Sequence, residues 1–97
     1  AVVAYRLLYS TNLADIEIMV EPDHRAFRVQ GEVVGLSKDP VTPALVQWLD
    51  DNGNLMYETE TDEEGRFQLR GVESGHYRVV VVPIHGELIE VQTLEIM

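Results

Sequence analysis

The sequence predicts an all-β fold, a seven-stranded antiparallel Greek-key sandwich. Apolar and polar residues alternate along most of the 97-residue chain, whereas the 3.6-residue period of an amphipathic helix is nearly absent. Turns containing glycine, proline or asparagine separate the alternating segments. In residues 61–82 a polar turn, a short strand, a glycine turn and a valine-rich strand follow one another directly. Short strands at this turn-marked spacing favour an antiparallel sandwich over a parallel sheet.

The first half of the chain contains two strands and the longest loop. Residues 16–20 alternate between apolar and other side chains, and Pro22 is expected to end this strand because it has no backbone N–H donor. In the next strand, residues 27–33, Gly31 shares the parity of the apolar residues, which indicates a bulge or close packing. Residues 36–43 contain two prolines and are expected to form a loop.

The second half contains the other strands. Ala44, Val46 and Trp48 make an inward face, and residues 51–54 form the strongest turn signal because Asn-Gly adopts the positive φ values of tight hairpins. Residues 55–60 are the predicted return strand. The short strand after the polar turn carries its apolar residues, Phe67 and Leu69, on one face.

The last two strands are predicted at 76–82, ended by Pro83, and at 88–96. In the final strand the apolar residues change parity, from Ile89 and Val91 to Leu94 and Ile96. A bulge near Gln92 or Thr93 would allow both pairs to face inward. The shared parity across the strands predicts one buried cluster containing Val29, Val46, Phe67, Tyr77 and Val79. Gly53 and Gly65, each closing an acidic turn, are expected to have positive φ.

Length and charge limit the classes of function. The chain is long enough for one domain with one core. Its formal charge of −10, with the 7 basic residues scattered, disfavours nucleic acid and anionic membranes as partners, since both need a cationic surface. The chain has no cysteine, which excludes disulfides and thiolate metal sites and leaves the redox compartment undecided.

No targeting signal is apparent in the sequence. No apolar run approaches the roughly 20 residues of a membrane span. The chain begins with Ala1 and shows no signal peptide, so it is expected to be an excised or processed domain of a larger protein. A cytoplasmic location is expected, and an extracellular one is not excluded.

Residues 27–96 carry a recognisable order of motifs: "G-x-V", a proline-bearing loop, "P-A-x-V-x-W", "D-x-x-G", "T-D-x-x-G-R-F-x-L-x-G-V" and "G-x-Y-x-V-x-V". This order resembles the carboxypeptidase regulatory-like, or transthyretin (prealbumin)-like, domain family. The motifs consist of turn glycines and core side chains, so they specify the fold more than the function. The segment that precedes residues 27–96, with residues 6–9 and 16–22, is similar to the region preceding such domains in bacterial proteins linked to sigma-factor and anti-sigma regulation.

Three chemistries known on this fold can be compared with the sequence. Intradiol dioxygenases hold ferric iron with two tyrosines and two histidines, whose spacing does not match that of Tyr5, Tyr9, Tyr57, Tyr77, His24, His76 and His85. Hydroxyisourate hydrolases end in a Tyr-Arg-Gly-Ser motif, which the last four residues, 94–97, lack. Adhesin repeats form an internal Lys–Asn amide bond, but the only lysine, Lys38, falls in a loop and the last strand has no asparagine.

Two acidic groups could in principle bind a cation. Asp50, Asn52 and Asn54 match the opening of a calcium loop, but Leu55 stands where the loop needs glycine and Thr61 where it needs the bidentate acid. A tight hairpin explains the same residues. The second group could gather a cation at one rim, although solvated loop carboxylates are the simpler interpretation; it consists of Glu58, Glu60, Asp62, Glu63 and Glu64. No catalytic, cofactor-binding or metal-binding residue is assigned.

The sequence therefore predicts a non-enzymatic interaction module, an accessory or regulatory part of a larger bacterial protein or assembly. We divide it into an N-terminal segment with an added edge strand, residues 1–25, and the sandwich domain, residues 26–97. The expected partner is a protein, with homodimerisation through the N-terminal segment as one form of it. The alternative is a carbohydrate- or small-ligand-binding domain that uses Trp48 with Tyr57, although Trp48 shares the inward parity of its strand.

Overall fold

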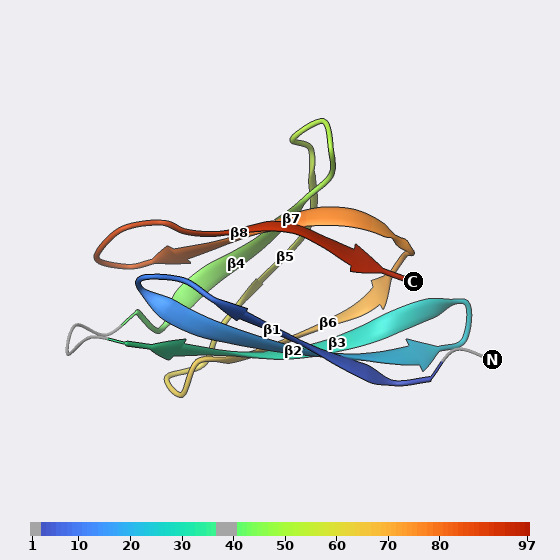
Figure 1. The fold of residues 1–97 in the computed structure, drawn as a ribbon, viewed down its shortest axis with the longest axis horizontal. Coiled ribbons are helices and arrows are strands. Elements are labelled where there is room, and N and C mark those ends of the chain that lie inside the picture. The colour runs from blue at the N-terminus through green and yellow to red at the C-terminus, as the bar shows by residue number, and fades with distance from the viewer. Residues whose placement is uncertain (1–2, 37–40) are drawn as a thin grey trace.

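The fold is a sandwich of two four-stranded antiparallel sheets (Figure 1). The computed structural model describes residues 3–36 and 41–97, and only the backbone of Gln92. Lys38 lies outside the described residues, as does most of the proline-bearing part of the predicted loop. Within the described chain there are eight strands: β1 (Tyr5–Ser10), β2 (Ala14–Asp23), β3 (Ala26–Gly35), β4 (Ala44–Leu49), β5 (Leu55–Glu60), β6 (Arg66–Val72), β7 (Gly75–Pro83) and β8 (Ile89–Ile96).

Each sheet combines strands that are distant in sequence. Sheet A has the order β1-β2-β3-β6, and sheet B has the order β5-β4-β7-β8. The chain crosses from one sheet to the other after β3, β5 and β6, and the two sheets form the two layers in Figure 1. The buried side chains between them form one core. Among the described residues there is no helix long and apolar enough to span a membrane.

The all-β sandwich is confirmed, but the number of strands differs from the prediction of seven. The additional strand is β1, which pairs with β2 over its whole length, from Tyr5 opposite Val20 to Ser10 opposite Asp15. Leu8 hid this strand in the sequence, because it places an apolar side chain at a solvent-facing position and interrupts the alternation. β2 consequently lies inside sheet A, and β1 forms its edge.

Pro22 does not end β2, as the sequence had suggested. The strand continues to Asp23, and Pro22 pairs opposite Phe27 of β3. Pairing with β1 stops at Val20, so Pro22 lies where β2 has a neighbouring strand on one side only. A proline is compatible with a strand at such a position because one of its sides needs no hydrogen bond.

Alternate residues of the six strands other than β1 and β5 build the core, and half-buried residues of these two strands pack against it. Val29, Val46, Phe67, Tyr77 and Val79 are all buried in one cluster, which confirms the predicted set. The bulge predicted in the last strand is also present, because Tyr77 pairs with Leu94 whereas Val79 pairs with Val91. The extra residue of β8 lets the two apolar pairs on either side of the bulge face inward.

Two glycines lie where a neighbouring residue leaves no room for a side chain. Gly31 lies opposite Phe67, and a Cβ added to Gly31 would lie only 2.1 Å from the Cζ of the Phe67 ring. The predicted close packing at Gly31 is therefore confirmed. Gly65 has a φ of +85°, and the carbonyl oxygen of Val33 would lie 2.2 Å from its added Cβ. Gly53 also has the predicted positive φ, +80°.

Candidate functional site

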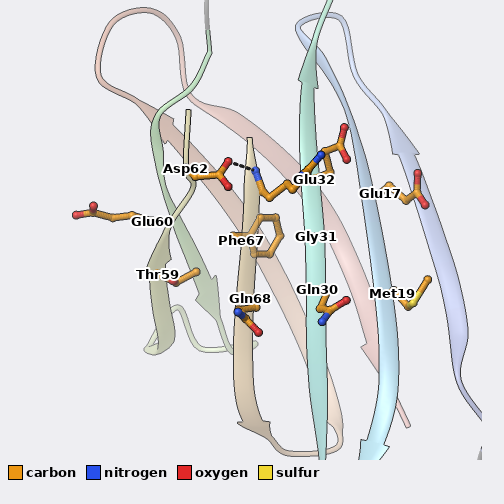
Figure 2. A pocket seen from close by; sticks show the side chains of 11 residues that line it. Glu17, Met19, Gln30, Gly31, Glu32, Thr59, Glu60, Asp62, Phe67 and Gln68 are labelled. Atoms are coloured by element: carbon orange, nitrogen blue, oxygen red, sulfur yellow. Dashed lines mark hydrogen bonds between the residues drawn. The ribbon is translucent and has the colours of Figure 1, made fainter. Parts of the chain in front are cut away.

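A shallow groove crosses the outer face of sheet A beside β5, with a volume of about 590 Å³ (Figure 2). Its floor comes from outward-facing residues of β2, β3 and β6, among which Met19, Gln30 and Gln68 lie in neighbouring strands. Phe67 closes the groove from below, where its ring covers Gly31. The groove brings together strands that sequence alone did not place side by side.

Carboxylates give the groove its charge. Glu17 and Glu32 face each other across the β2–β3 pair, and the Oε1 atom of Glu17 lies 3.1 Å from the Nε atom of Arg6. Asp62 lies at the upper end of the groove, where its Oδ1 atom accepts a hydrogen bond from the backbone N–H of Arg66 at 2.9 Å (Figure 2). The groove is open and acidic, so it could accept hydrogen bonds from a cationic group.

No group of three or more acidic, histidine or cysteine side chains is placed to hold a metal ion within residues 3–36 and 41–97. Three of the five acidic residues of the predicted rim have separate contacts. Glu58 accepts a hydrogen bond from Gln47 at 2.9 Å, Glu64 pairs with Arg66 at 3.0 Å, and Asp62 bonds to the backbone of its own turn.

The calcium-like stretch that begins at Asp50 is a tight hairpin. Asp50 Oδ1 accepts the backbone N–H groups of Asn52 and Asn54, at 2.9 and 2.8 Å, and Asp50 Oδ2 accepts the side-chain amide of Asn54. Asp62 accepts the backbone N–H groups of Glu64 and Arg66 in the same way. The two Asp-x-x-Gly turns thus have the same design, in which an aspartate organises the turn and the glycine supplies positive φ.

The Asp50 turn predicts a specific pH dependence of stability. Hydrogen bonds from the backbone N–H and then the side chain of Asn54 hold the pKa of Asp50 below its ordinary value of 3.8. Because the depressed pKa favours the folded state only when Asp50 is ionised, the stabilisation is present above about pH 4 and is lost as the pH falls through the folded-state pKa. We expect Asp50→Ala to destabilise the domain at pH 7 and to cost less at pH 2.5, as measured by urea denaturation. The matched variant Asp62→Ala reports on the second turn. If Asp50→Ala lowered the free energy of unfolding by the same amount at both pH values, the stabilising role of the ionised Asp50 carboxylate would be contradicted.

Trp48 and Tyr77 belong to the core, and Tyr57 packs against it. Trp48 is 0% exposed, and its ring centroid lies 5.5 Å from that of Tyr77. Tyr77 donates its hydroxyl to the carbonyl oxygen of Glu73 at 2.7 Å, and Tyr57 accepts the backbone N–H of Glu73 at 2.9 Å. Burial raises the pKa of Tyr77. Tyr77 is therefore a core residue and Tyr57 a half-buried one that packs against the core, and both hydroxyls bind the backbone of Glu73.

These positions exclude the ligand-stacking interpretation of Trp48. A fully buried indole cannot present a face to a sugar ring. Trp48 therefore cannot take part in the Trp48–Tyr57 binding site that the sequence had suggested as an alternative. The dioxygenase comparison fails for a related reason. His76 lies on the exterior of β7, 3.7 Å from Glu95, whereas the adjacent Tyr77 points into the core.

The outer face of sheet B carries an apolar strip that the sequence analysis missed. We define the strip as the half-buried aliphatic side chains on the outward face of the two central strands: Leu45, Leu49, Val80 and Val82. Gln47, which pairs opposite Val80, is the polar residue among them. Leu45 pairs directly with Val82 across β4 and β7, and the more exposed Met56 and Leu55 lie on the neighbouring strand β5. The signal in the sequence was the uninterrupted run 79–82, which makes β7 apolar on both faces rather than on one.

The fold defines a small antiparallel β-sandwich domain with a single core and glycine-containing turns. Its two notable surfaces are the acidic groove on sheet A and the apolar strip on sheet B. A family comparison agrees: residues 28–96 match the model of the carboxypeptidase regulatory-like domain. The chain belongs to this family. No curated protein and no solved structure matches the chain. The matched part begins within β3, so β1 and β2 precede it and still complete sheet A.

Proposed function

We propose that this domain is a non-catalytic protein-interaction module, an accessory or regulatory part of a larger bacterial protein or assembly, and that it docks its partner on the apolar strip. One observation carries the proposal: around Gln47, the central strands of sheet B present four aliphatic side chains outward, where a solvent-facing sheet would present mainly polar ones. Contiguous apolar surface that is rimmed by polar groups is typical of protein contacts.

The contrast with sheet A supports this choice of surface. On the outer face of sheet A charged residues pair with each other, Glu21 with Arg28 and Glu32 with Arg66. The apolar residues of that face, Leu8, Met19 and Val34, pair with polar residues and not with one another. β7 instead alternates buried Val79 and Val81 with half-buried Val80 and Val82. A strand that is apolar on both faces is typical of one that is covered on both sides.

Charge indicates the chemistry of the partner. Carboxylates flank the strip on both sides, since Glu60 pairs opposite Leu45 on β5 and Glu90 pairs opposite Val80 on β8. Arg78 lies 3.2 Å from Glu90, so among the described residues the unpaired negative charge is on the β5 side. The whole chain carries a formal charge of −10. A partner with aliphatic side chains at its centre and lysine or arginine at its rim fits this surface, because opposite charges around an apolar centre favour association.

The proposal predicts that the strip is shielded when the protein is in its native assembly. Val82→Cys and Gln30→Cys each introduce a single thiol, because the chain has no cysteine of its own. We expect maleimide to label Val82→Cys several-fold more slowly in the cells that make the protein than in the purified domain, because a partner covers it there. Gln30→Cys, on the outer face of sheet A, serves as the matched control and should react equally in both settings. Equal reactivity of Val82→Cys in both settings would refute docking on the strip, and selective shielding of Gln30→Cys would move the interface to sheet A.

A further inference from the structure

The edge strand β1 is the least protected of the four sheet edges. The other edge strands carry irregularities and charge: register shifts interrupt the pairing of β5, β6 and β8, and each of these strands presents two charged side chains outward. β1 pairs with β2 without a shift and contains one charged residue, Arg6. Its neighbouring outward residue, Leu8, is 67% exposed. Bulges and charges are what prevent edge strands from pairing with another chain, and β1 lacks most of this protection.

The hydrogen bonds of the β1–β2 turn show which backbone groups of β1 remain on the open side. Thr11 donates its backbone N–H to the carbonyl oxygen of Ala14 at 2.9 Å. Hydrogen-bonded and non-hydrogen-bonded pairs alternate along an antiparallel ladder, so the backbone groups of Tyr5, Leu7 and Tyr9 point towards β2. The N–H and C=O groups of Arg6, Leu8 and Ser10 therefore point away from the sheet.

We propose that β1 pairs antiparallel with β1 of a second copy of this chain, and that the two-fold axis passes through Leu8. Residues that lie directly opposite each other in an antiparallel pair point to the same face of the sheet. An even-numbered residue must therefore lie opposite an even-numbered one, so that the core-facing residues of the two copies stay on one side of the joined sheet. Centring on Leu8 pairs Leu8 with Leu8 of the second copy and Arg6 with Ser10. All the open backbone groups of β1 then find partners within β1.

The side chains support this register. Leu8 meets its counterpart on the outer face and loses its exposed apolar surface. On the core side, Leu7 faces Tyr9 of the second copy, which extends the half-buried apolar row that packs against the core. Centring on Leu7 instead would place Arg6 opposite Leu8 and would leave Ser10 to pair outside β1. The result is a continuous eight-stranded sheet formed from two copies of sheet A.

Sedimentation tests whether the dimer forms. The mass should rise with concentration from the 11.0 kDa of one chain towards twice that value. Added salt should tighten association, because each copy carries a formal charge of −10 that opposes pairing until it is screened. Leu8→Pro removes an outward N–H from an edge strand, which a folded monomer tolerates, and should abolish the dimer. The matched variant Leu8→Ile keeps the N–H and the apolar contact and should remain dimeric.

Disulfide trapping tests the register without depending on whether Leu8→Pro folds. In the proposed pairing the two Leu8 Cα atoms lie about 5.5 Å apart, within disulfide range, so oxidised Leu8→Cys should give a covalent dimer. The two copies of Ser10 lie about 13 Å apart along the strands, so Ser10→Cys should not cross-link. A chain that is monomeric at every salt concentration and that yields no Leu8→Cys disulfide refutes the proposal. Cross-linking of Ser10→Cys as efficient as that of Leu8→Cys refutes the register.

Discussion

Gly65→Val is expected to reduce the free energy of unfolding by roughly 3–5 kcal/mol, the sum of backbone strain and overpacking. Gly65 has a φ of +85°, which a β-branched residue rarely adopts. A Cβ there would lie 2.2 Å from the carbonyl oxygen of Val33 and 3.2 Å from the Cγ2 atom of Thr42. The clash involves backbone, which cannot rotate away. The backbone N–H of Val33 also donates a hydrogen bond to the carbonyl oxygen of Gly65 at 2.8 Å, which holds the two segments together. Urea denaturation of the two proteins measures the difference.

Gly53→Val provides a matched control, because the chain contains the same turn twice. Gly53 has a φ of +80°, but no atom lies within 4 Å of an added Cβ. This variant should show only the strain of positive φ, about 1–2 kcal/mol. An equal loss in both variants would mean that contact with β3 contributes nothing at Gly65, and an unchanged melting temperature for Gly65→Val would contradict the turn itself.

The local features of this fold were predictable because they depend on short stretches of sequence. Positive φ at Gly53 and Gly65 follows from turn chemistry, and the bulge in β8 follows from a change of parity around Gln92 and Thr93. Parity also placed Trp48 in the core. In each case neighbouring residues contain all the information, since side chains in a strand alternate between two faces.

The features that the sequence did not reveal depend on which strands become neighbours. Parity indicates the face of a residue but not the strand beside it, so the groove that joins β2, β3, β5 and β6 could not be predicted. The same limit hid β1, where Leu8 obscured the alternation that pairing with β2 makes evident. The run 79–82 was a sequence signal for the apolar strip. However, four consecutive valines fit a strand that is buried on both faces within its own domain as well as one whose outer face is left for a partner.

Phe67→Ala should reduce the free energy of unfolding by about 3–5 kcal/mol, the usual cost of truncating a buried phenylalanine. Phe67 is 5% exposed, and its ring occupies the space that a side chain at position 31 would fill. Denaturant unfolding measures the loss. A value below about 1 kcal/mol would show that the ring does not belong to the core.

The pair Gly31 and Phe67 allows a sharper test, because the two positions compete for one volume. Gly31→Ala alone should destabilise the domain by about 1–3 kcal/mol, since its Cβ would lie 2.1 Å from the Phe67 ring. In the Phe67→Ala background the same methyl group enters the space that the ring has vacated, so its penalty should fall or reverse. The double-mutant cycle should therefore give a coupling energy of about 1–3 kcal/mol. Additive losses would mean that strands β3 and β6 separate to accommodate the methyl group, and that the glycine is not required by the ring that covers it.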